Sequence, residues 1–374
     1  MTNSFFDQFG LKRIINASGK MTALGASAVT EEVANALKAA AQSYVDMDEL
    51  IEYAGKVIAH HTGAEDGCPT NGAATGIVIS TAAVIAGKNI SLIERMPNSG
   101  GLKNEIIIQK GQNINFGGNI DQMIRMGGGQ VIEVGSVNKV EIDHIGEAIT
   151  DKTAALIYIK SHHAVQKGMQ SIESMIKIAQ KHHIPLMIDG AAESDFQKYI
   201  EMGADVVIYS GGKALGGPTS GFISGKRQLM EACREQYKGI GRAMKVGKES
   251  IAGLIVALNQ YPFRDTRADE QFNRMKAFCK RLNEVEGLTG TIHQDEAGRR
   301  IYRARIEVQK QANVTAEQLL HRLESGKPGI YLRAHYANVG ILFVDPRPLL
   351  AGQEDIIAER IIAIIKEEGD DNVE

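Results

Sequence analysis

Short apolar runs alternate with helical patterns between residues 105 and 224, and this alternation restricts the fold more than any other feature of the sequence. Continuous apolar strands separated by helices are typical of a parallel sheet that is covered by helices on both faces. In such α/β folds, ligands lie at the carboxyl ends of the strands. We place the strands at Glu105–Gln109, Val131–Val134, Ala154–Lys160, Pro185–Asp189, Val206–Tyr209 and Gly221–Ser224.

Three segments are expected along the 374-residue chain. Residues 1–50 are predicted to form an N-terminal arm and a helix, and residues 51–258 the large α/β domain. Residues 259–374 are predicted to form a smaller α+β domain, because strand and helix patterns there follow a different order. That order is strand Ile301–Val308, helix Ala316–Leu323, strands Ile330–His335 and Gly340–Val344, and helix Glu354–Lys366.

Composition argues against several classes of protein. The net charge of −3 gives no overall basic field that would attract nucleic acid. The longest mainly apolar stretch, residues 76–87, is too short to span a bilayer. The three cysteines are scattered without C-x-x-C spacing, and the paired histidines lack metal-ligand spacing. We therefore expect a cytoplasmic protein with no bound metal, no membrane partner and no nucleic-acid partner.

The loop Ser210-Gly211-Gly212-Lys213-Ala214-Leu215-Gly216-Gly217-Pro218 places a lysine among glycines directly after a predicted strand. Glycines let a backbone turn tightly and approach a ligand closely. Lys213 is therefore either a solvated lysine of a glycine-rich loop or an amine that forms a Schiff base with an aldehyde cofactor. A nucleotide-binding phosphate loop is excluded, because alanine follows this lysine and the preceding glycines lack the required spacing.

Two motifs upstream favour the cofactor interpretation. Asn71-Gly72-Ala73-Ala74 precedes a run of small residues, an arrangement typical of helix N-termini that bind phosphate. The strand Pro185–Asp189 ends in a carboxylate, which needs a cationic partner if it is buried. The pyridinium of pyridoxal 5′-phosphate (PLP) is such a partner; alternatively, Asp189 caps the following helix. Lys213 follows Asp189 by 24 residues, with one helix and one strand between, so both are expected at neighbouring strand ends.

Together these motifs resemble the fold-type I PLP enzymes. More narrowly, they resemble the selenocysteine-synthase-like branch, which contains the L-seryl-tRNA selenium transferases and the D-glucosaminate-6-phosphate ammonia-lyases. Matching stretches also occur at residues 15–19 and 241–248, so the resemblance runs from about residue 10 to about residue 260. It implies the fold-type I transferase fold, with a mainly parallel seven-stranded sheet. The C-terminal domain matches only in its pattern.

The resemblance also implies roles for single residues. Lys213 would be the Schiff-base lysine and Asp189 the partner of the pyridine nitrogen. The other implied cofactor-binding residues are Ser210 and the Asn71, Gly72 and Ala73 backbone at the phosphate, Gly212 in the lysine loop, and Gln112 and His162 at the ring. Gln112 is assigned to the ring because the expected stacking position holds no aromatic residue before Phe116. The implied substrate-binding residues are Asn16, Arg242, Lys245 and Arg333; the last three are cations, which suit acidic groups.

The implied reaction is α,β-elimination by a PLP-dependent ammonia-lyase. The expected substrate is a phosphorylated 2-amino-3-hydroxy sugar acid, 2-amino-2-deoxy-D-gluconate 6-phosphate, and the products are 2-keto-3-deoxy-gluconate 6-phosphate and ammonia. The alternatives are a selenium-transferase-like enzyme that acts on seryl-tRNA, or another PLP lyase or aldolase acting on a small amino acid. The mildly acidic net charge favours the first reaction over one on tRNA. The Asn16 motif also lies close to the start of the sequence, so we expect no tRNA-binding domain before it. A homodimer or higher homo-oligomer with shared active sites is expected.

Overall fold

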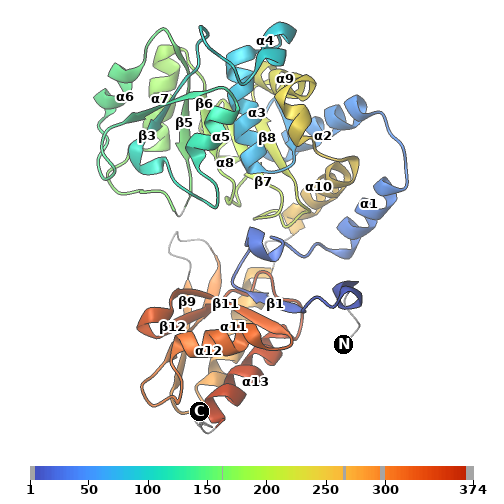
Figure 1. Cartoon of the computed structure of the whole chain (residues 1–374), viewed down its shortest axis with the longest axis vertical. Coiled ribbons are helices and arrows are strands. Elements are labelled where there is room, and N and C mark those ends of the chain that lie inside the picture. The colour runs from blue at the N-terminus through green and yellow to red at the C-terminus, as the bar shows by residue number, and fades with distance from the viewer. Residues whose placement is uncertain (1–4, 162, 264–266, 295–299, 368–374) are drawn as a thin grey trace. The chain divides into compact units, whose positions relative to one another are not determined.

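The computed structural model describes residues 5–161, 163–263, 267–294 and 300–367. The chain divides into two compact units (Figure 1). One unit comprises Ala28–Pro262, and the other joins Met1–Ser27 with Phe263–Glu374. The three domains expected from the sequence, 1–50, 51–258 and 259–374, stay a prediction; in the compact units, the first strand of the chain groups with the C-terminal segment. Every helix within the described residues is too short or too polar to cross a bilayer.

A seven-stranded sheet forms the centre of the larger unit. Its strand order is β2 (Asp66–Thr70), β8 (Gly221–Gly225), β7 (Val206–Ser210), β6 (Leu186–Asp189), β5 (Thr153–Ile159), β3 (Glu105–Gln109) and β4 (Gln130–Val134). The strands from β7 to β4 are parallel, whereas β8 runs antiparallel to both β7 and β2. The sequence predicted six of these strands but not the edge strand β2, since its Gly67-Cys68-Pro69 segment reads as a loop.

Helices cover both faces of this sheet (Figure 1). Neighbouring residues of a strand point to opposite faces. Accordingly, Ile107 of β3 joins a core with Met175 of α7, and Ile106 joins the other core with Ile77 of α3. The helices of this unit are α1 (Glu31–Ala41), α2 (Met47–Thr62), α3 (Ala73–Ala86), α4 (Ile90–Arg95), α5 (Ile120–Met126), α6 (Ile142–Ala148), α7 (Ile172–His182), α8 (Lys198–Glu201), α9 (Arg227–Glu235) and α10 (Lys248–Gln260).

The small residues of α3 let this helix lie close against the sheet. A side chain at Gly76 would place its Cβ 2.6 Å from Cγ2 of Ile208 on β7, which no real contact allows. Glycine at this position therefore brings the start of α3 against the strand that leads to Lys213. The small-residue run after the Asn71 motif is thus explained by packing as well as by any ligand.

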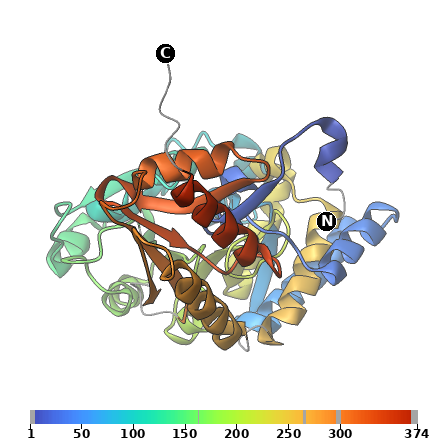
Figure 2. The ribbon, with the colours of Figure 1, turned by 90° about the horizontal axis from the view of Figure 1, so that it is seen from below.

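The smaller unit is a five-stranded sheet with helices packed against one face (Figure 2). Its strand order is β1 (Ile14–Ala17), β11 (Gly329–Tyr336), β12 (Ile341–Val344), β10 (Tyr302–Val308) and β9 (Leu288–Gln294). The helices are α11 (Arg267–Leu282), α12 (Ala316–Ser325) and α13 (Gln353–Lys366). The expected α+β pattern is confirmed, with α11 and β9 added. The predicted N-terminal arm contains the strand β1, which pairs in parallel with β11.

Candidate active site

The residues predicted to hold a cofactor phosphate come together at one edge of the large sheet. Ser210, at the end of β7, pairs with Gly221 of β8, which in turn pairs with Thr70 of β2. Thr70 directly precedes the predicted phosphate loop at residues 71–73. A Cβ at Gly221 would lie 2.6 Å from the backbone carbon of Gly72, so the close approach of these segments requires glycine. Segments about 140 residues apart in sequence therefore form one small cradle.

The first turn of α3 offers backbone donors to this cradle. Gly72 is the N-cap of the helix and provides no side-chain cap, and Ala73 is its first residue. The first N–H groups of a helix have no partners within the helix, and they carry partial positive charge. Together with the hydroxyl of Ser210, these groups suit an anionic phosphate.

The Lys213 loop is held in a compact shape by its own backbone. Gly211 donates its N–H to Ser220 O at 2.8 Å, and Gly217 donates to Gly211 O at 2.7 Å. A Cβ at Gly211 would meet Oγ of Ser220 at 2.1 Å, so no other residue fits there. The loop thus fixes the backbone of Lys213, whose side chain is half-buried.

Asp189 is a buried carboxylate whose pKa is affected by the nearby charge of Lys213. It is 7% exposed, and its Oδ1 accepts a hydrogen bond from the N–H of Ala191 at 3.0 Å. Burial raises the pKa of Asp189 above its usual value, and the nearby charge of Lys213 and the Ala191 N–H offset only part of the rise. The alternative that Asp189 caps the following helix is wrong, because Oδ1 of Asp195 accepts the N–H of Lys198 at the start of α8. A further cation beside Asp189 would stabilise its charged form.

Gln112, assigned to the cofactor ring, lies fully buried next to β5. Its Oε1 accepts the N–H of Ile159, which pairs with Asp189, at 3.1 Å. Its Nε2 makes no hydrogen bond of normal geometry within the described residues. Burial raises the pKa of the Tyr158 hydroxyl, and the nearby Gln112 amide offsets part of that rise. Gln112 therefore lies beside the strand end that carries Asp189. His162, the other residue assigned to the ring, lies outside the described residues.

The basic stretch after the lysine loop divides into two kinds of residue. Arg242 and Lys245 are exposed, and their side chains make no hydrogen bond or ion pair within the described residues. Lys248 instead donates from Nζ to the carbonyl oxygens of Ala40 at 2.6 Å and Ala41 at 3.2 Å, at the end of α1. Lys248 thus stabilises the C-terminus of α1, and two of the three cations are available to an anion.

Asn16 and Arg333 belong to the smaller unit. The Asn16 side chain closes a turn: its Nδ2 donates to Gly19 O at 2.8 Å, and its Oδ1 accepts the N–H of Ser18 at 3.0 Å. Arg333 lies on β11, and its Nη1 is 3.7 Å from where a Cβ of Gly19 would be. The structure therefore brings Asn16 and Arg333 to the same turn. Their assignment to substrate stays a prediction, as do those of the other site residues.

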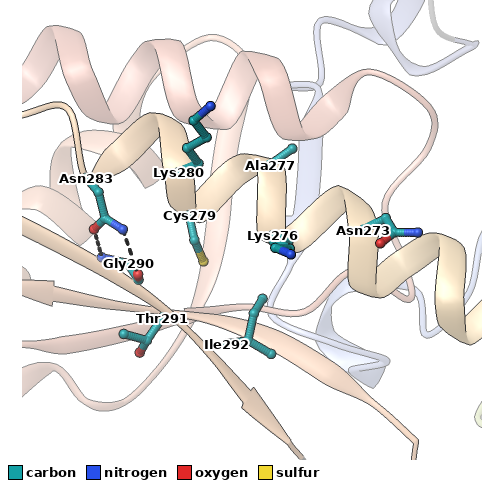
Figure 3. Close-up of a pocket in the computed structure, with 9 residues that line it drawn as sticks. All are labelled: Asn273, Lys276, Ala277, Cys279, Lys280, Asn283, Gly290, Thr291 and Ile292. Atoms are coloured by element: carbon teal, nitrogen blue, oxygen red, sulfur yellow. Dashed lines mark hydrogen bonds between the residues drawn. The ribbon is translucent and has the colours of Figure 1, made fainter.

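Sequence analysis missed the fully buried carboxylate of Asp345 and the two arginines that bind it, Arg303 and Arg347. A signal for it exists: Asp345 directly follows an apolar strand, much as Asp189 ends one. An open hollow of about 580 Å³ lies elsewhere, between α11 and β9 (Figure 3). Its lining residues, such as Lys276, Cys279 and Ile292, include none of the predicted site residues.

Comparison with known proteins identifies the family. The family model described as L-seryl-tRNA selenium transferase matches residues 14–326. The chain belongs to this family. Within it, D-glucosaminate-6-phosphate ammonia lyase of Salmonella typhimurium is 41% identical over 371 residues, which cover 99% of this chain and 100% of that protein. A solved structure of D-glucosaminate-6-phosphate ammonia-lyase matches with a TM-score of 0.93 at 41% identity, and covers 98% of this chain and 99% of its own.

Another relative carries a different activity in its name. The 5′-C-glycyluridine monooxygenase-decarboxylase of a Streptomyces species is 40% identical over 369 residues, which cover 97% of this chain and 92% of that protein. A serine palmitoyltransferase from S. paucimobilis, solved with bound PLP and myriocin, shares the fold at 12% identity with a TM-score of 0.56, and covers 94% of this chain and 87% of its own. The predicted fold-type I architecture and the resemblance to the selenocysteine-synthase-like branch are therefore confirmed.

Proposed function

We propose that this protein is a PLP-dependent ammonia-lyase that acts on 2-amino-2-deoxy-D-gluconate 6-phosphate. The observation that carries the proposal is the full-length match, at 41% identity and a TM-score of 0.93, to an ammonia-lyase named for this substrate. The placement of Lys213 near the buried carboxylate of Asp189 supports the cofactor. The cradle between Ser210 and the start of α3 fits the cofactor phosphate.

Each residue has a task in the proposed reaction. PLP, when bound, supplies an electron sink for negative charge at the substrate Cα. Asp189 holds a proton at the pyridine nitrogen, and the half-buried Lys213 amine takes the proton from Cα. Departure of the 3-hydroxyl as water and hydrolysis of the C–N bond then give the 2-keto-3-deoxy acid and ammonia. Arg242, Lys245 and Arg333 suit the carboxylate and phosphate of the substrate, because guanidinium and ammonium groups bind both.

The test of this proposal is product analysis. The protein loaded with PLP is incubated with 2-amino-2-deoxy-D-gluconate 6-phosphate, and ammonia and 2-keto acid are measured. One equivalent of each per substrate consumed is expected from the wild-type protein, and none from Lys213→Ala. Turnover by Lys213→Ala at the wild-type rate would remove Lys213 from the reaction. Absence of both products from wild-type holoenzyme would reject the activity.

A second candidate function follows from the Streptomyces relative, whose 40% identity nearly equals that of the ammonia lyase. It is oxidative decarboxylation of 5′-C-glycyluridine, which differs from elimination in consuming O₂ and releasing CO₂. The same preparation incubated with 5′-C-glycyluridine under air therefore distinguishes the two. A third arm with seryl-tRNA and a selenium donor tests the reaction in the family's name. We expect the protein to convert neither 5′-C-glycyluridine nor seryl-tRNA.

Assembly and location complete the proposal. We propose a homodimer or higher homo-oligomer in which one protomer supplies Arg242 and Lys245 to its partner's site. Their exposure without any ion pair in the described part of the chain supports this arrangement. We also propose that the enzyme works in the cytoplasm, which the three free, buried cysteines support.

A further inference from the structure

The pairing between β3 and β5 ends before β5 does. The last paired residues are Ile108 and Ile157, because the chain turns into the 3₁₀ helix η3 (Lys110–Gln112) directly after β3. Ile159, the last residue of β5, is fully buried, so its N–H group needs another partner. The side chain of Gln112 supplies it, since Oε1 accepts this N–H at 3.1 Å. An amide side chain therefore takes the place of a neighbouring strand at the end of β5.

Close packing fixes the backbone that carries Gln112. Gly111, directly before it, is buried, and a Cβ there would lie 2.4 Å from the carbonyl oxygen of Val137 and 2.9 Å from Cβ of Val165. Such a close approach requires glycine. The carbonyl oxygen of Gly111 also accepts the N–H of Val165 at 2.9 Å. Gln112 is itself 0% exposed, so its amide has little freedom to leave Ile159.

The other side of the same strand end contacts Asp189. Ile159 pairs with Asp189 of β6, and the next residue, Lys160, donates its N–H to Asp189 O at 2.9 Å. Gln112 and Asp189 thus bind successive backbone N–H groups at the end of β5. The backbone of Asp189 is therefore separated from the Gln112 amide by a single strand.

We propose that Gln112 is a positioning residue for Asp189 and that it acts through the end of β5. Its amide keeps Ile159 and Lys160 in register with Asp189, and so holds the buried carboxylate in place for the pyridine nitrogen of PLP. A displacement of about 1 Å in an active site can lower a rate by about 10²-fold, so a contact one strand away matters. This role does not require the contact with the ring that the resemblance implies. Its effect on proton abstraction rests on the proposed function, whereas its effect on bound PLP does not.

Gln109, at the end of β3, is a matched control. It is also 0% exposed, but its amide binds the backbone of Gln170, with Oε1 accepting the N–H at 2.6 Å and Nε2 donating to the carbonyl oxygen at 3.2 Å. Methionine keeps the length of glutamine and nearly its volume but lacks the amide. Gln109→Met therefore removes a buried amide of the same segment without touching Ile159 or Asp189. Gln112→Asn keeps an amide that is one methylene too short, and remains informative if Gln112→Met fails to fold.

The first experiment follows hydrogen exchange in the full-length protein by mass spectrometry. Peptides covering residues 155–161 report on the amide of Ile159, and peptides covering residues 168–172 report on the amide of Gln170. We expect Gln112→Met to speed the exchange of one amide at least about tenfold in the first peptide only, and Gln109→Met to do so in the second only. Unchanged exchange of residues 155–161 in Gln112→Met would overturn the role of Gln112 at the end of β5.

The second experiment measures protonation of the ring nitrogen. The protein is loaded with PLP that carries ¹⁵N in the ring, and the ¹⁵N chemical shift is followed by NMR as the pH is raised. We expect the ring in Gln112→Met and Gln112→Asn to lose its proton at a lower pH than in wild type, because a displaced carboxylate stabilises the pyridinium less. Gln109→Met should titrate as wild type does. A Gln112→Met titration identical to that of wild type would mean that Gln112 has no influence on Asp189.

The two proposals fail in different ways. Neither the hydrogen exchange nor the ring signal needs turnover, so wild-type protein that binds PLP but leaves the sugar acid unchanged would reject the proposed reaction alone. Where the reaction is present, we expect Gln112→Met to lower kcat at least about tenfold and to change KM far less, because Asp189 acts in the chemical step. Wild-type protein without affinity for PLP would overturn both proposals.

Discussion

The Asp189 carboxylate, buried at the end of β6, lies close enough to Lys213 to be affected by the charge of the lysine. That charge lowers the pKa of Asp189, while burial raises it by more. A buried carboxylate favours its neutral form unless a cation stabilises the charge. A ring nitrogen that must stay protonated supplies that cation, which makes the pair suited to PLP.

Reduction with borohydride should fix the cofactor to Lys213. The wild-type protein loaded with PLP is reduced and digested, and mass spectrometry then locates the adduct. We expect one modified peptide, containing residues 208–221, because the compact loop presents this lysine at the strand ends. Lys213→Ala should give no adduct and no turnover. Lys226, exposed just beyond β8, is a control that should remain unmodified; an adduct there or on another lysine would contradict the assignment.

Asp189→Asn should separate cofactor binding from proton abstraction. The variant keeps the size of the side chain and a hydrogen-bond acceptor for the Ala191 N–H, so we expect it to retain PLP. Without the carboxylate the ring nitrogen loses its proton, and exchange of the substrate Cα hydrogen with deuterium should fall by roughly 10²–10⁴-fold. Exchange is followed by NMR. Asp195→Asn, at an exposed carboxylate that accepts the N–H of Lys198 at the start of α8, should exchange at the normal rate.

Most of the fold could be predicted from regular patterns in the sequence. The pairings between distant segments could not be predicted in this way. Continuous apolar runs predicted β3 and β5 almost to the residue, because burial on both faces leaves little choice of side chain. The strand β2 was missed since its glycine and proline are tolerated only by an edge position. Helix α11 was missed because charged residues hide its narrow apolar stripe.

Part of the candidate site could also be predicted from the sequence, whereas contacts between distant residues could not. Lys213 and Asp189 could be found because Asp189 ends one strand and Lys213 lies in the loop after another, and strand ends meet at one edge of a parallel sheet. Local sequence contains no comparable signal that Lys248 binds the carbonyl oxygens at the end of α1. The partners of Asp345 were also hidden, since Arg303 reaches it from a strand 42 residues away in the sequence.

Asp345→Asn should destabilise the protein and make its free energy of unfolding less dependent on pH in the acidic range. Folding lowers the pKa of Asp345, so the unfolded chain binds this proton more tightly, and the stabilisation present near neutral pH is lost as pH falls below about 5. The substitution removes the negative charge that Arg303 and Arg347 bind, and we expect it to lower the free energy of unfolding by about 3–5 kcal/mol. Urea unfolding at pH 7, 5 and 4 measures both effects. Asp355→Asn, at an exposed carboxylate, should follow wild type; an Asp345→Asn curve parallel to wild type would contradict the linkage.

Mixing two inactive variants should restore activity if the sites are shared between protomers. Arg242 and Lys245 are exposed and make no ion pair within the described residues, so an anion of a neighbouring protomer's site can bind them. A two-fold dimer is the commonest closed assembly. In a hybrid of Lys213→Ala and Arg242→Ala chains, one of the two sites then combines an intact Lys213 with an intact Arg242. Random reassembly of equal amounts gives hybrids in half of the dimers, so about a quarter of wild-type activity is expected.

The reassembly needs a control for exchange of subunits. The two variants carry different tags, are unfolded and refolded together, and the hybrid fraction is isolated through both tags. Two differently tagged Lys213→Ala preparations treated in the same way should remain inactive, because no combination of them contains the lysine. If the isolated hybrid of Lys213→Ala and Arg242→Ala is also inactive, each site is built from one chain, and Arg242 acts on its own protomer. Recovery close to half of the wild-type activity in that fraction means that one protomer's Arg242 completes the other's site.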